Sequence, residues 1–471
     1  MTAACLDLSA AELAAEYRAR RLSPVEVATA ALERIAAEDA ALDSFLTVTG
    51  ERALEDARRA ESDFAAGRDR GPMQGVPYAL KDIVETAGIR TTGQSRSRAD
   101  HVPTADAAVS ARLAAGGGVL LGKTTTWEFA HGGPSWDVVG PPARNPWNPE
   151  RHPAGSSSGT GAAVAAGFAT TGIGTDTGGS IRLPAAACGI AGLKPTYGRV
   201  SRRGVFPNCF SHDHVGPMAR TVRDAAMMLQ AIAGHDPADP GSADRPVPDY
   251  QAALTGDAAG LVVGVPWAWL DEADCSEGTR AAFDAALEAL KEAGAAITPV
   301  ALPPLAAYSD SKKTIAMSEL FSIHGQTLRQ TPELLGASLR YRIQCGALIR
   351  AEDYIRAMRL RARLAAATQA VFASVDLLAT PCAEPAGKLE PTHPSSLFKI
   401  GSLTTPFNSA GNPALSVCMG FDGDGMPHAL QLAGRCFDEA TVLRAGDAFE
   451  RVTGWTTRRP ARLSPAGAPA A

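Results

Sequence analysis

The sequence predicts an α/β protein in which helices cover a layered sheet. Residues 260–266 and 296–300 have the short apolar pattern of strands, and residues 279–294 between them have the periodicity of an amphipathic helix. A strand–helix–strand succession is typical of a sheet with helices packed on its faces. The chain has 471 residues, of which 45% are hydrophobic and 20% charged, so it can bury a large core.

The N-terminal part of the chain is predicted to form amphipathic helices. Ser9 is followed by Glu12, and Ser23 by Glu26, and this spacing is typical of capping boxes at helix starts. We therefore expect a helical N-terminal cap over about residues 1–65 that packs on the body of the protein.

No targeting or membrane segment is evident. The first residues lack a basic stretch followed by a long apolar core, and no apolar run approaches the roughly 20 residues that span a bilayer. We therefore expect a cytoplasmic protein that does not associate with a membrane.

Residues 117–124 match the pattern of a phosphate-binding loop. Such a loop follows a strand and opens a helix, whereas here residues 119–121 are themselves the expected strand and residues 107–115 the preceding helix. We therefore reject nucleotide binding.

The strongest chemical signal is the segment Thr177-Gly178-Gly179-Ser180. Glycine adopts dihedral angles that are closed to other residues, so a Thr-Gly-Gly run lets backbone N–H groups converge on one point. Ser180 would then stand where an acyl carbon meets both a nucleophile and the donors that stabilise an oxyanion.

A nucleophilic serine needs a base, and no histidine stands in a recognisable triad motif. Lys81 is the candidate instead, because it ends an apolar strand that could bury it. Burial disfavours the charged amine and so lowers the pKa of a lysine, which is what a lysine base requires.

Together these segments resemble the amidase signature family of serine hydrolases. Residues 75–82 resemble its lysine strand, residues 155–159 its first serine loop and residues 174–182 its nucleophile loop. The resemblance implies one domain over residues 1–460, with an α/β/α fold in which helices cover both faces of a large, mixed, twisted sheet. Residues 461–471 are expected to be a disordered tail.

The resemblance also implies a Ser-cisSer-Lys triad. Ser180 would be the nucleophile, Ser156 the bridging serine on a cis peptide bond, and Lys81 the final proton acceptor. The backbone N–H groups of the oxyanion hole would be those of Thr177, Gly178, Gly179 and Ser180. The residues expected to support the site are Gly155, Ser157, Asp176 and Arg182.

Substrate choice is the least readable property. A helical region over about residues 302–372 is expected to cover the pocket, whose expected lining residues are Ala130, Trp127, His131, Cys382 and Phe398. The recognisable loops carry no charged anchor. We therefore expect a hydrolase of neutral apolar or aryl amides that also cleaves carbamates (urethanes) and esters.

Two other functions remain open at this point. One is the catalytic subunit of a glutamine-dependent tRNA amidotransferase, which would need a protein partner. The other is a non-catalytic binding scaffold, which would form no acyl-enzyme.

Composition shapes the expected partners. The formal charge of −5, from 45 basic and 50 acidic residues, gives no electrostatic footprint for nucleic acid. We expect a small-molecule amide or carbamate substrate, no nucleic acid, and a monomer or homodimer. We expect no cofactor and no metal, because His212-Asp213-His214 lacks a matching distant cluster and the cysteines are scattered.

Overall fold

The computed structural model describes residues 4–392 and 402–462, and its centre is a mixed sheet of 11 strands. The strands are β1 (Phe45–Val48), β2 (Pro77–Lys81), β3 (Val119–Thr124), β4 (Thr171–Asp176), β5 (Ala191–Lys194), β6 (His214–Ala219), β7 (Val262–Val265), β8 (Ala296–Pro299), β9 (Leu377–Pro381), β10 (Ala414–Phe421) and β11 (Pro427–Gly434). Their order across the sheet is β1-β3-β2-β4-β6-β5-β10-β11-β9-β7-β8. The strand β2 runs parallel to β3 and β4, and β7 runs parallel to β8 and β9, whereas the other neighbours are antiparallel.

The helices surround this sheet. They are α1 (Ala10–Arg18), α2 (Pro24–Glu38), α3 (Gly50–Ala65), α4 (Ala108–Ala115), α5 (Ser158–Ala165), α6 (Arg182–Cys188), α7 (Val222–Ile232), α8 (Trp267–Glu272), α9 (Glu277–Glu292), α10 (Leu305–Gln330), α11 (Ala337–Gly346), α12 (Ala351–Val371), α13 (Thr405–Ser409) and α14 (Glu439–Thr453). Short 3-10 helices are η1 (Ala4–Asp7), η2 (Asp39–Ala41), η3 (Arg96–Arg98), η4 (Glu128–Ala130), η5 (Pro332–Leu334) and η7 (Trp455–Thr457).

Both faces of the sheet are covered, because alternate strand residues point to opposite sides. Leu80 and Leu120 join the core that α7, α9 and α14 pack against. Ala79, Val119 and Leu121 instead pack with apolar residues of α2 and α3. The predicted fold class, a large mixed sheet between two helical layers, is therefore confirmed.

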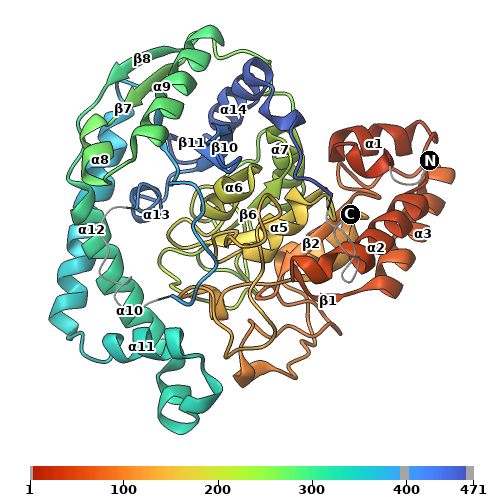
Figure 1. Cartoon of the computed structure of the whole chain (residues 1–471), viewed down its shortest axis with the longest axis horizontal. Coiled ribbons are helices and arrows are strands. Elements are labelled where there is room, and N and C mark those ends of the chain that lie inside the picture. Colours follow the sequence, from red (N-terminus) through yellow and green to blue (C-terminus); the bar gives the residue numbers. More distant parts are fainter. Residues whose placement is uncertain (1–3, 393–401, 463–471) are drawn as a thin grey trace.

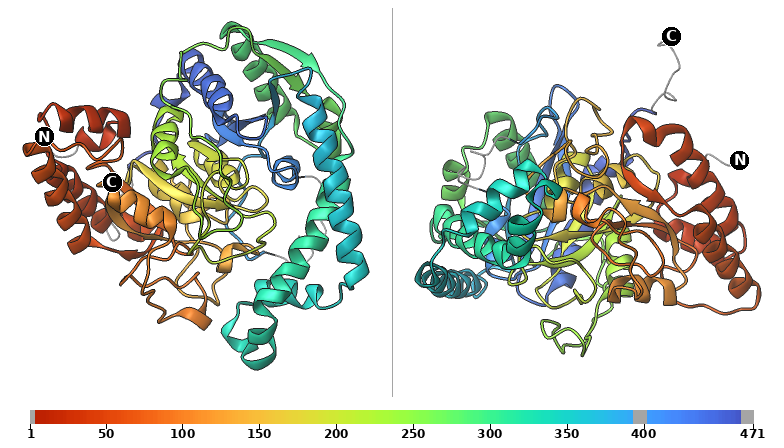
Figure 2. Two further views of the ribbon diagram at one scale, coloured as in Figure 1. Left: turned by 180° about the vertical axis from the view of Figure 1, so that it is seen from behind. Right: turned by 90° about the horizontal axis from the view of Figure 1, so that it is seen from below.

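Two groups of helices lie at opposite sides of the molecule. In Figure 1, α1, α2 and α3 form a compact red group beside the β1 edge, and α10 and α12 stand at the far side. Figure 2 shows the same separation from behind and from below. The region that we expected to be helical, residues 302–372, therefore forms a wall on the side away from the N-terminus.

Local signals placed several elements correctly. Ser9 and Ser23 each cap a helix through a complete capping box, at α1 and α2. The predicted strand–helix–strand unit is β7, α9 and β8, with β7 and β8 parallel. Residues 119–124 form a strand, and Lys123 donates to the Val84 carbonyl and the Thr91 hydroxyl. The segment that matches the phosphate-loop pattern is therefore not a phosphate-binding loop.

Some expectations concern residues or boundaries that the structure does not test. The predicted tail lies outside the described residues from 463 onward. The assignment of a single domain to residues 1–460 stays a prediction. Within the described ranges, no helix combines the length and the apolar character needed to cross a bilayer.

One buried ion pair joins the segments around the nucleophile loop. The side chains of Asp176, at the end of β4, and Arg182, at the start of α6, are both 0% exposed, and Arg182 Nε donates to Asp176 Oδ2 at 2.9 Å. Arg182 also donates to the Thr404 carbonyl, to Gln431 Oε1 and to Asn408 Oδ1. A single guanidinium therefore ties β4 and α6 to α13 and β11.

The carboxylate of this pair is ionised. Burial raises the pKa of Asp176, but the charge of Arg182 and its hydrogen bonds outweigh burial and hold that pKa well below its usual range. Removing one partner of a buried pair leaves an uncompensated charge.

We predict that Arg182→Met lowers the free energy of unfolding by about 3–5 kcal/mol, because Asp176 would remain buried without its cation. Urea unfolding followed by circular dichroism measures this. The control is Lys291→Met, which removes an exposed pair with Glu288 whose side chains are 50% and 70% exposed and should change the free energy by less than about 1 kcal/mol. Equal urea midpoints for Arg182→Met and the wild type would contradict the prediction.

Candidate active site

Lys81 and Ser156 are in direct contact. Lys81 is the last residue of β2 and is 0% exposed, and β4 runs parallel beside it. Lys81 Nζ lies 2.7 Å from Ser156 Oγ and 2.8 Å from Thr175 Oγ1. The amine is thus held between the hydroxyl of the serine loop and a hydroxyl on the neighbouring strand.

The amine of Lys81 titrates near neutrality. Burial lowers its pKa to about 7, while the negative charges of Asp176 and Asp213 act in the opposite direction. Burial dominates because the charged amine loses its hydration and no carboxylate of residues 4–392 and 402–462 pairs with it directly. At neutral pH a large fraction of Lys81 is uncharged and can accept a proton.

The serine loop is fixed from several sides. The Gly155–Ser156 peptide bond is cis, as the resemblance implies. The Ser156 carbonyl accepts from the Trp127 N–H at 3.1 Å and from the Thr126 hydroxyl at 3.0 Å. Trp127 packs so closely on Gly155 that a Cβ atom there would lie 2.3 Å from the ring.

Ser157 connects this loop to the nucleophile loop. Its N–H donates to the Ser180 carbonyl at 3.3 Å, and its hydroxyl accepts from the Thr175 N–H at 3.2 Å. Ser157 therefore joins the serine loop to the Ser180 loop through its N–H group and to the end of β4 through its hydroxyl.

Ser180 is half-buried between β4 and α6, in a loop whose polar groups are held individually. Gly179 N–H donates to Asp176 Oδ1 at 2.7 Å, and the Gly178 carbonyl accepts from the Thr404 hydroxyl at 2.7 Å. The Thr177 hydroxyl donates to Asp213 at 2.6 Å. These bonds orient the loop without using the N–H groups of Thr177, Gly178 and Ser180.

Three of the four predicted oxyanion donors are available. In residues 4–392 and 402–462, the N–H groups of Thr177, Gly178 and Ser180 donate to no protein acceptor. The Gly179 N–H is occupied by Asp176. The loop therefore offers three open donors around Ser180.

The expected hydrogen bond between Ser156 and Ser180 is not formed in this structure. Lys81 and Ser156 are hydrogen-bonded, whereas no hydrogen bond joins the hydroxyls of Ser156 and Ser180 among the described residues. Such contacts often tighten only when substrate is bound.

The expected pocket residues have different surroundings. Trp127 lies on Gly155, and the Ala130 carbonyl accepts from Asn208 at 2.7 Å. His131 is 8% exposed beside the same Asn208. Cys382 lies behind α6, where its thiol is 3.6 Å from the Arg182 carbonyl. Phe398 is outside the described residues.

The His212-Asp213-His214 segment is engaged in internal bonds. His212 Nδ1 is 2.8 Å from the Ser211 hydroxyl, and His214 Nδ1 is 2.6 Å from the His212 carbonyl. Asp213 accepts from the N–H groups of Asn208 and Cys209. Over the described ranges, no three potential ligands gather in a metal-binding arrangement.

Sequence reasoning missed Thr175, Thr404 and Asn408. Thr175 contacts Lys81, Thr404 holds the Gly178 carbonyl, and Asn408 donates to Asp176 Oδ1 at 2.8 Å. Thr404 and Asn408 are more than 200 residues from the loop, and only the fold brings them there. Thr175 lies five residues before Ser180, so its position at the end of β4 was the one available signal.

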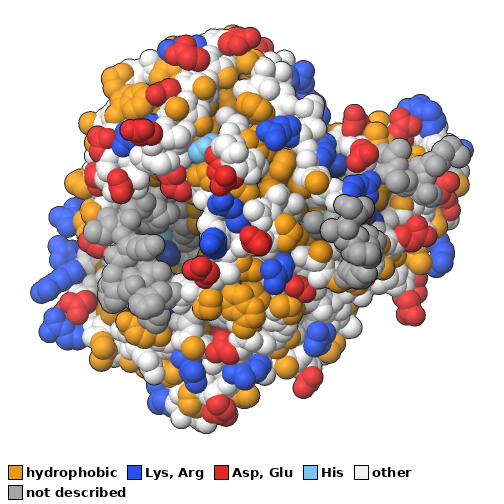
Figure 3. Space-filling view, viewed as in Figure 1, with side chains coloured by type: hydrophobic (Ala, Val, Ile, Leu, Met, Phe, Trp, Pro, Cys, Tyr) orange, Lys and Arg blue, Asp and Glu red, His pale blue; other side chains and the backbone are white. Residues whose placement is uncertain are grey.

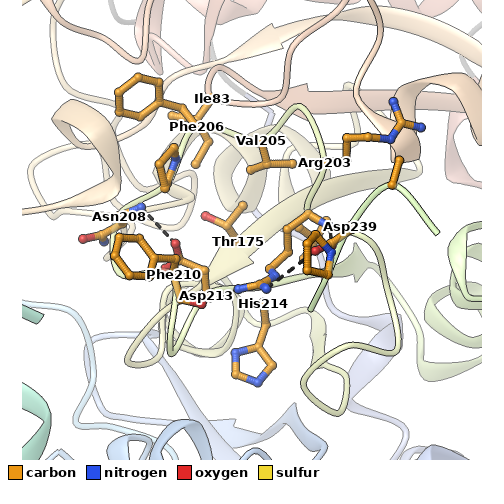
Figure 4. A pocket seen from close by; sticks show the side chains of 15 residues that line it. Ile83, Thr175, Arg203, Val205, Phe206, Asn208, Phe210, Asp213, His214 and Asp239 are labelled. Carbon is orange, nitrogen blue, oxygen red and sulfur yellow. Dashed lines mark hydrogen bonds and ion pairs between the residues drawn. The ribbon is translucent and has the colours of Figure 1, made fainter. Parts of the chain in front are cut away.

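A cavity of about 270 Å³ adjoins the lysine end of the site. Figure 4 shows Thr175 among its lining side chains, with Phe206 and Phe210 toward one side and Arg203 and Asp239 toward the other. Ser180 does not line this cavity. The cavity therefore borders Thr175, which contacts Lys81, and not Ser180.

We predict that Gly179→Ala slows the reaction of Ser180 with a fluorophosphonate by about 10²–10³-fold, the range typical for loss of an oxyanion donor, because a shifted loop displaces the open N–H groups of Gly178 and Ser180. Gly179 has φ +128°, and an added Cβ atom would lie 2.5 Å from Thr404 Oγ1, so the loop must shift. Intact-mass spectrometry over time measures labelling. Gly278→Ala, where nothing lies within 4 Å of the added atom, is the control. A wild-type rate in Gly179→Ala would contradict the prediction.

Known proteins resemble this chain over nearly its whole length. The A subunit of the glutamyl-tRNA(Gln) amidotransferase of Chloroflexus aggregans is 42% identical, over 97% of this chain and 98% of its own. The structure of the A subunit of the same enzyme from Thermotoga maritima superposes with a TM-score of 0.83 at 30% identity, covering 97% and 98% of the two chains. The peptide amidase of Stenotrophomonas maltophilia superposes with a TM-score of 0.85 at 32% identity, covering 96% and 98%.

These relatives contradict the function that we expected first. That expectation, a hydrolase of neutral apolar or aryl amides, carbamates and esters, gives way to the alternative, the catalytic subunit of a tRNA amidotransferase. The physical reason is that the signature loops are expected to act only on the carbonyl group, which amides, carbamates and esters all share. They therefore carry no information about the rest of the substrate.

The expected partners are wrong for a related reason. The amidotransferase relatives named above are subunits of a larger enzyme, which contradicts a chain that acts by itself, as monomer or homodimer, on a small molecule without nucleic acid. The face in Figure 3 carries intermingled basic and acidic side chains, in keeping with the formal charge. Charge describes one chain, however, and does not reveal an RNA held by a partner protein.

The family model named Amidase matches residues 26–443, which include the lysine strand and both serine loops. The cis peptide bond, the contact between Lys81 and Ser156 and the eleven-stranded sheet agree with that match. This chain is therefore an enzyme of the amidase signature family.

Proposed function

We propose that this chain is the glutamine-hydrolysing subunit of a tRNA amidotransferase, with Ser180 as nucleophile and Ser156 and Lys81 as its proton relay. The observation that carries the proposal is the 42% identity to the A subunit of such an enzyme over 97% of the chain. The geometry of Lys81, Ser156 and the nucleophile loop supplies the groups that amide cleavage needs.

The reaction begins with uncharged Lys81. In that state the Ser156 hydroxyl donates to Lys81 Nζ, across the 2.7 Å contact, and can accept the proton of Ser180 in turn. Ser180 Oγ then forms a bond to the side-chain amide carbon of glutamine, and the carbonyl electrons move to oxygen. The N–H groups of Thr177, Gly178 and Ser180 stabilise that oxyanion.

Collapse of this adduct breaks the C–N bond. Ser156 gives its proton to the departing nitrogen and recovers one from Lys81, so ammonia leaves and a γ-glutamyl ester remains on Ser180. Water attacks this ester, and the same relay takes its proton and returns it to Ser180. Glutamate leaves, and the ammonia is available to an acceptor on the partner assembly.

The Gly179 N–H has a separate role in this proposal. Because it donates to Asp176 at 2.7 Å, it holds the loop rather than the oxyanion. Asp176 and Arg182 act indirectly. They fix the orientation of the N–H groups of Thr177, Gly178 and Ser180.

We predict that the purified chain releases equal amounts of ammonia and glutamate from L-glutamine, and that this activity falls by at least about 10³-fold in each of Ser180→Ala, Ser156→Ala and Lys81→Ala. Loss of any relay member removes a proton transfer that both steps need. A coupled glutamate assay measures turnover, and a fluorophosphonate followed by intact-mass analysis should mark Ser180. Ser374→Ala, an exposed serine far from the loop in sequence, is the control.

Two outcomes would overturn the proposal. A chain that labels at Ser180 yet leaves L-glutamine intact would not supply ammonia from glutamine. A wild-type rate in Lys81→Ala or Ser156→Ala would remove the relay. The partner is tested by recovering the tagged chain from its own cells, since the bound fraction should use glutamine to amidate glutamyl-tRNA in the presence of ATP.

The pH dependence follows from the state of Lys81. Its pKa is lowered to about 7 in the folded protein, and only the uncharged amine accepts a proton. We predict that kcat/KM for L-glutamine rises about tenfold per pH unit below pH 6 and levels off above pH 8. A plateau that continues down to pH 5 would contradict this assignment.

Thr175→Val tests whether Lys81 causes the rise of kcat/KM between pH 6 and pH 8. The Thr175 hydroxyl accepts a hydrogen bond from Lys81 Nζ at 2.8 Å, so its loss disfavours the charged amine and lowers the pKa further. The rising limb should therefore move to lower pH in Thr175→Val. A limb that stays in place or moves to higher pH would assign the titration to another group.

A further inference from the structure

A lysine of the outer helical wall reaches the nucleophile loop. Lys312 is on α10, within the helical region over residues 302–372 that was expected to cover the pocket. A Cβ atom added at Gly178 would lie 2.9 Å from Lys312 Nζ and 3.2 Å from its Cε. The ammonium therefore packs on the backbone of Gly178, two residues before the nucleophile.

The charge of Lys312 has no partner carboxylate among the described residues. Asp176 and Asp213 are the carboxylates whose charges act on it, and neither forms an ion pair with it. Asp176 is paired with Arg182, and Asp213 accepts from Thr177 and from backbone N–H groups. Because a partly buried cation without a counter-ion is costly, this position is suited to an anionic ligand.

Charges of both signs surround Lys312. Burial lowers its pKa most, and the charge of Arg342 lowers it too, whereas the charges of Asp176 and Asp213 raise it. The thiol of Cys209 is also near, but burial raises its pKa well above the usual value, so it stays uncharged at neutral pH.

His131 presents a hydrogen-bond acceptor in the same neighbourhood. Its Nδ1 lies 3.0 Å from Asn208 Oδ1, and the Asn208 amide nitrogen donates to the Ala130 carbonyl at 2.7 Å. That second bond fixes the amide orientation, so His131 Nδ1 carries the proton and Nε2 is an acceptor. Among the described residues, Nε2 is buried without a partner.

The state of His131 agrees with this assignment. Burial lowers its pKa well below the ordinary value, and the charges of Arg342 and Lys312 lower it further. His131 is therefore neutral, and its side chain is only 8% exposed. A buried acceptor without a donor is itself costly, which favours a ligand N–H at this point.

We propose that Lys312 binds a carboxylate of the substrate and that His131 Nε2 accepts a hydrogen bond from an N–H group beside that carboxylate. This inference rests on the proposed function, in which the two groups are the α-carboxylate and α-ammonium of glutamine. It makes Lys312 and His131 specificity-determining residues and identifies the substrate as an α-amino acid amide.

The first experiment compares L-glutamine with 4-aminobutanamide, which is glutamine without its α-carboxylate. The wild type should prefer glutamine, and Lys312→Met should reduce the ratio of the two kcat/KM values by about 10–100-fold, as expected for a hydrogen bond to a charged group. Lys312→Arg should keep most of the preference. Lys291→Met, with the same charge change on the exposed face of α9, should leave the ratio unchanged.

Ser180 labelling by a fluorophosphonate shows that the loop is intact in each variant, and should stay within about threefold of wild type in Lys312→Met. An equal loss on both amides, or no loss on either, would overturn the role of Lys312. The readout is a ratio, so general damage to the site does not imitate the expected result.

A second comparison tests His131 with glutaramate, which is glutamine without its α-amino group. His131→Phe should reduce the preference for glutamine over glutaramate by about 3–10-fold, because one buried hydrogen bond is lost. An unchanged preference would remove His131 from the proposal.

The failure of this inference can be separated from failure of the proposed function. If the wild type does not hydrolyse L-glutamine, the amidotransferase proposal falls, and succinamate and butanamide then test Lys312 directly. Selective loss of succinamate hydrolysis in Lys312→Met would keep Lys312 as a carboxylate site. Equal effects on this pair would overturn it.

Discussion

The buried pair between Asp176 and Arg182 is the constraint on which the site depends. Its two members lie on either side of Ser180, so the pair closes the nucleophile loop at its base. The same guanidinium reaches Thr404 and Asn408, and Thr404 in turn holds the Gly178 carbonyl. The positions of the open N–H groups of Thr177, Gly178 and Ser180 are therefore set by packing between β4, α6, α13 and β11, and not by the loop alone.

Burial then produces two lysines with different properties around that loop. Among the described residues, Lys81 Nζ makes hydrogen bonds to hydroxyl groups alone, so burial brings its pKa to about 7, which suits a base. Lys312 lies on Gly178 at the half-exposed side of the loop, where a substrate anion can reach it. One amine is suited to accept protons because burial lets it lose its charge, and the other is proposed to bind an anion that would compensate its charge.

The sequence allowed the fold class and the chemical groups to be predicted, because both have short-range signals. The capping serines Ser9 and Ser23 and the spaced segments around Lys81, Ser156 and Ser180 can each be read within a few residues. The edge strand β1 and the hairpin of β10 and β11 carried no such signal, since their pairing joins distant segments. Thr404 and Asn408 reach the site for the same reason and could not have been predicted.

Substrate identity could not be predicted because the motifs contain only the residues that are expected to act on the carbonyl group. A backbone cradle binds any amide, so its presence in this chain says nothing about the remaining substrate groups. The absence of a charged anchor in the motif loops suggested a neutral substrate, yet Lys312 supplies a cation from α10. Since a helix can bring a charge to a loop more than a hundred residues away, a neutral motif is no evidence for a neutral substrate.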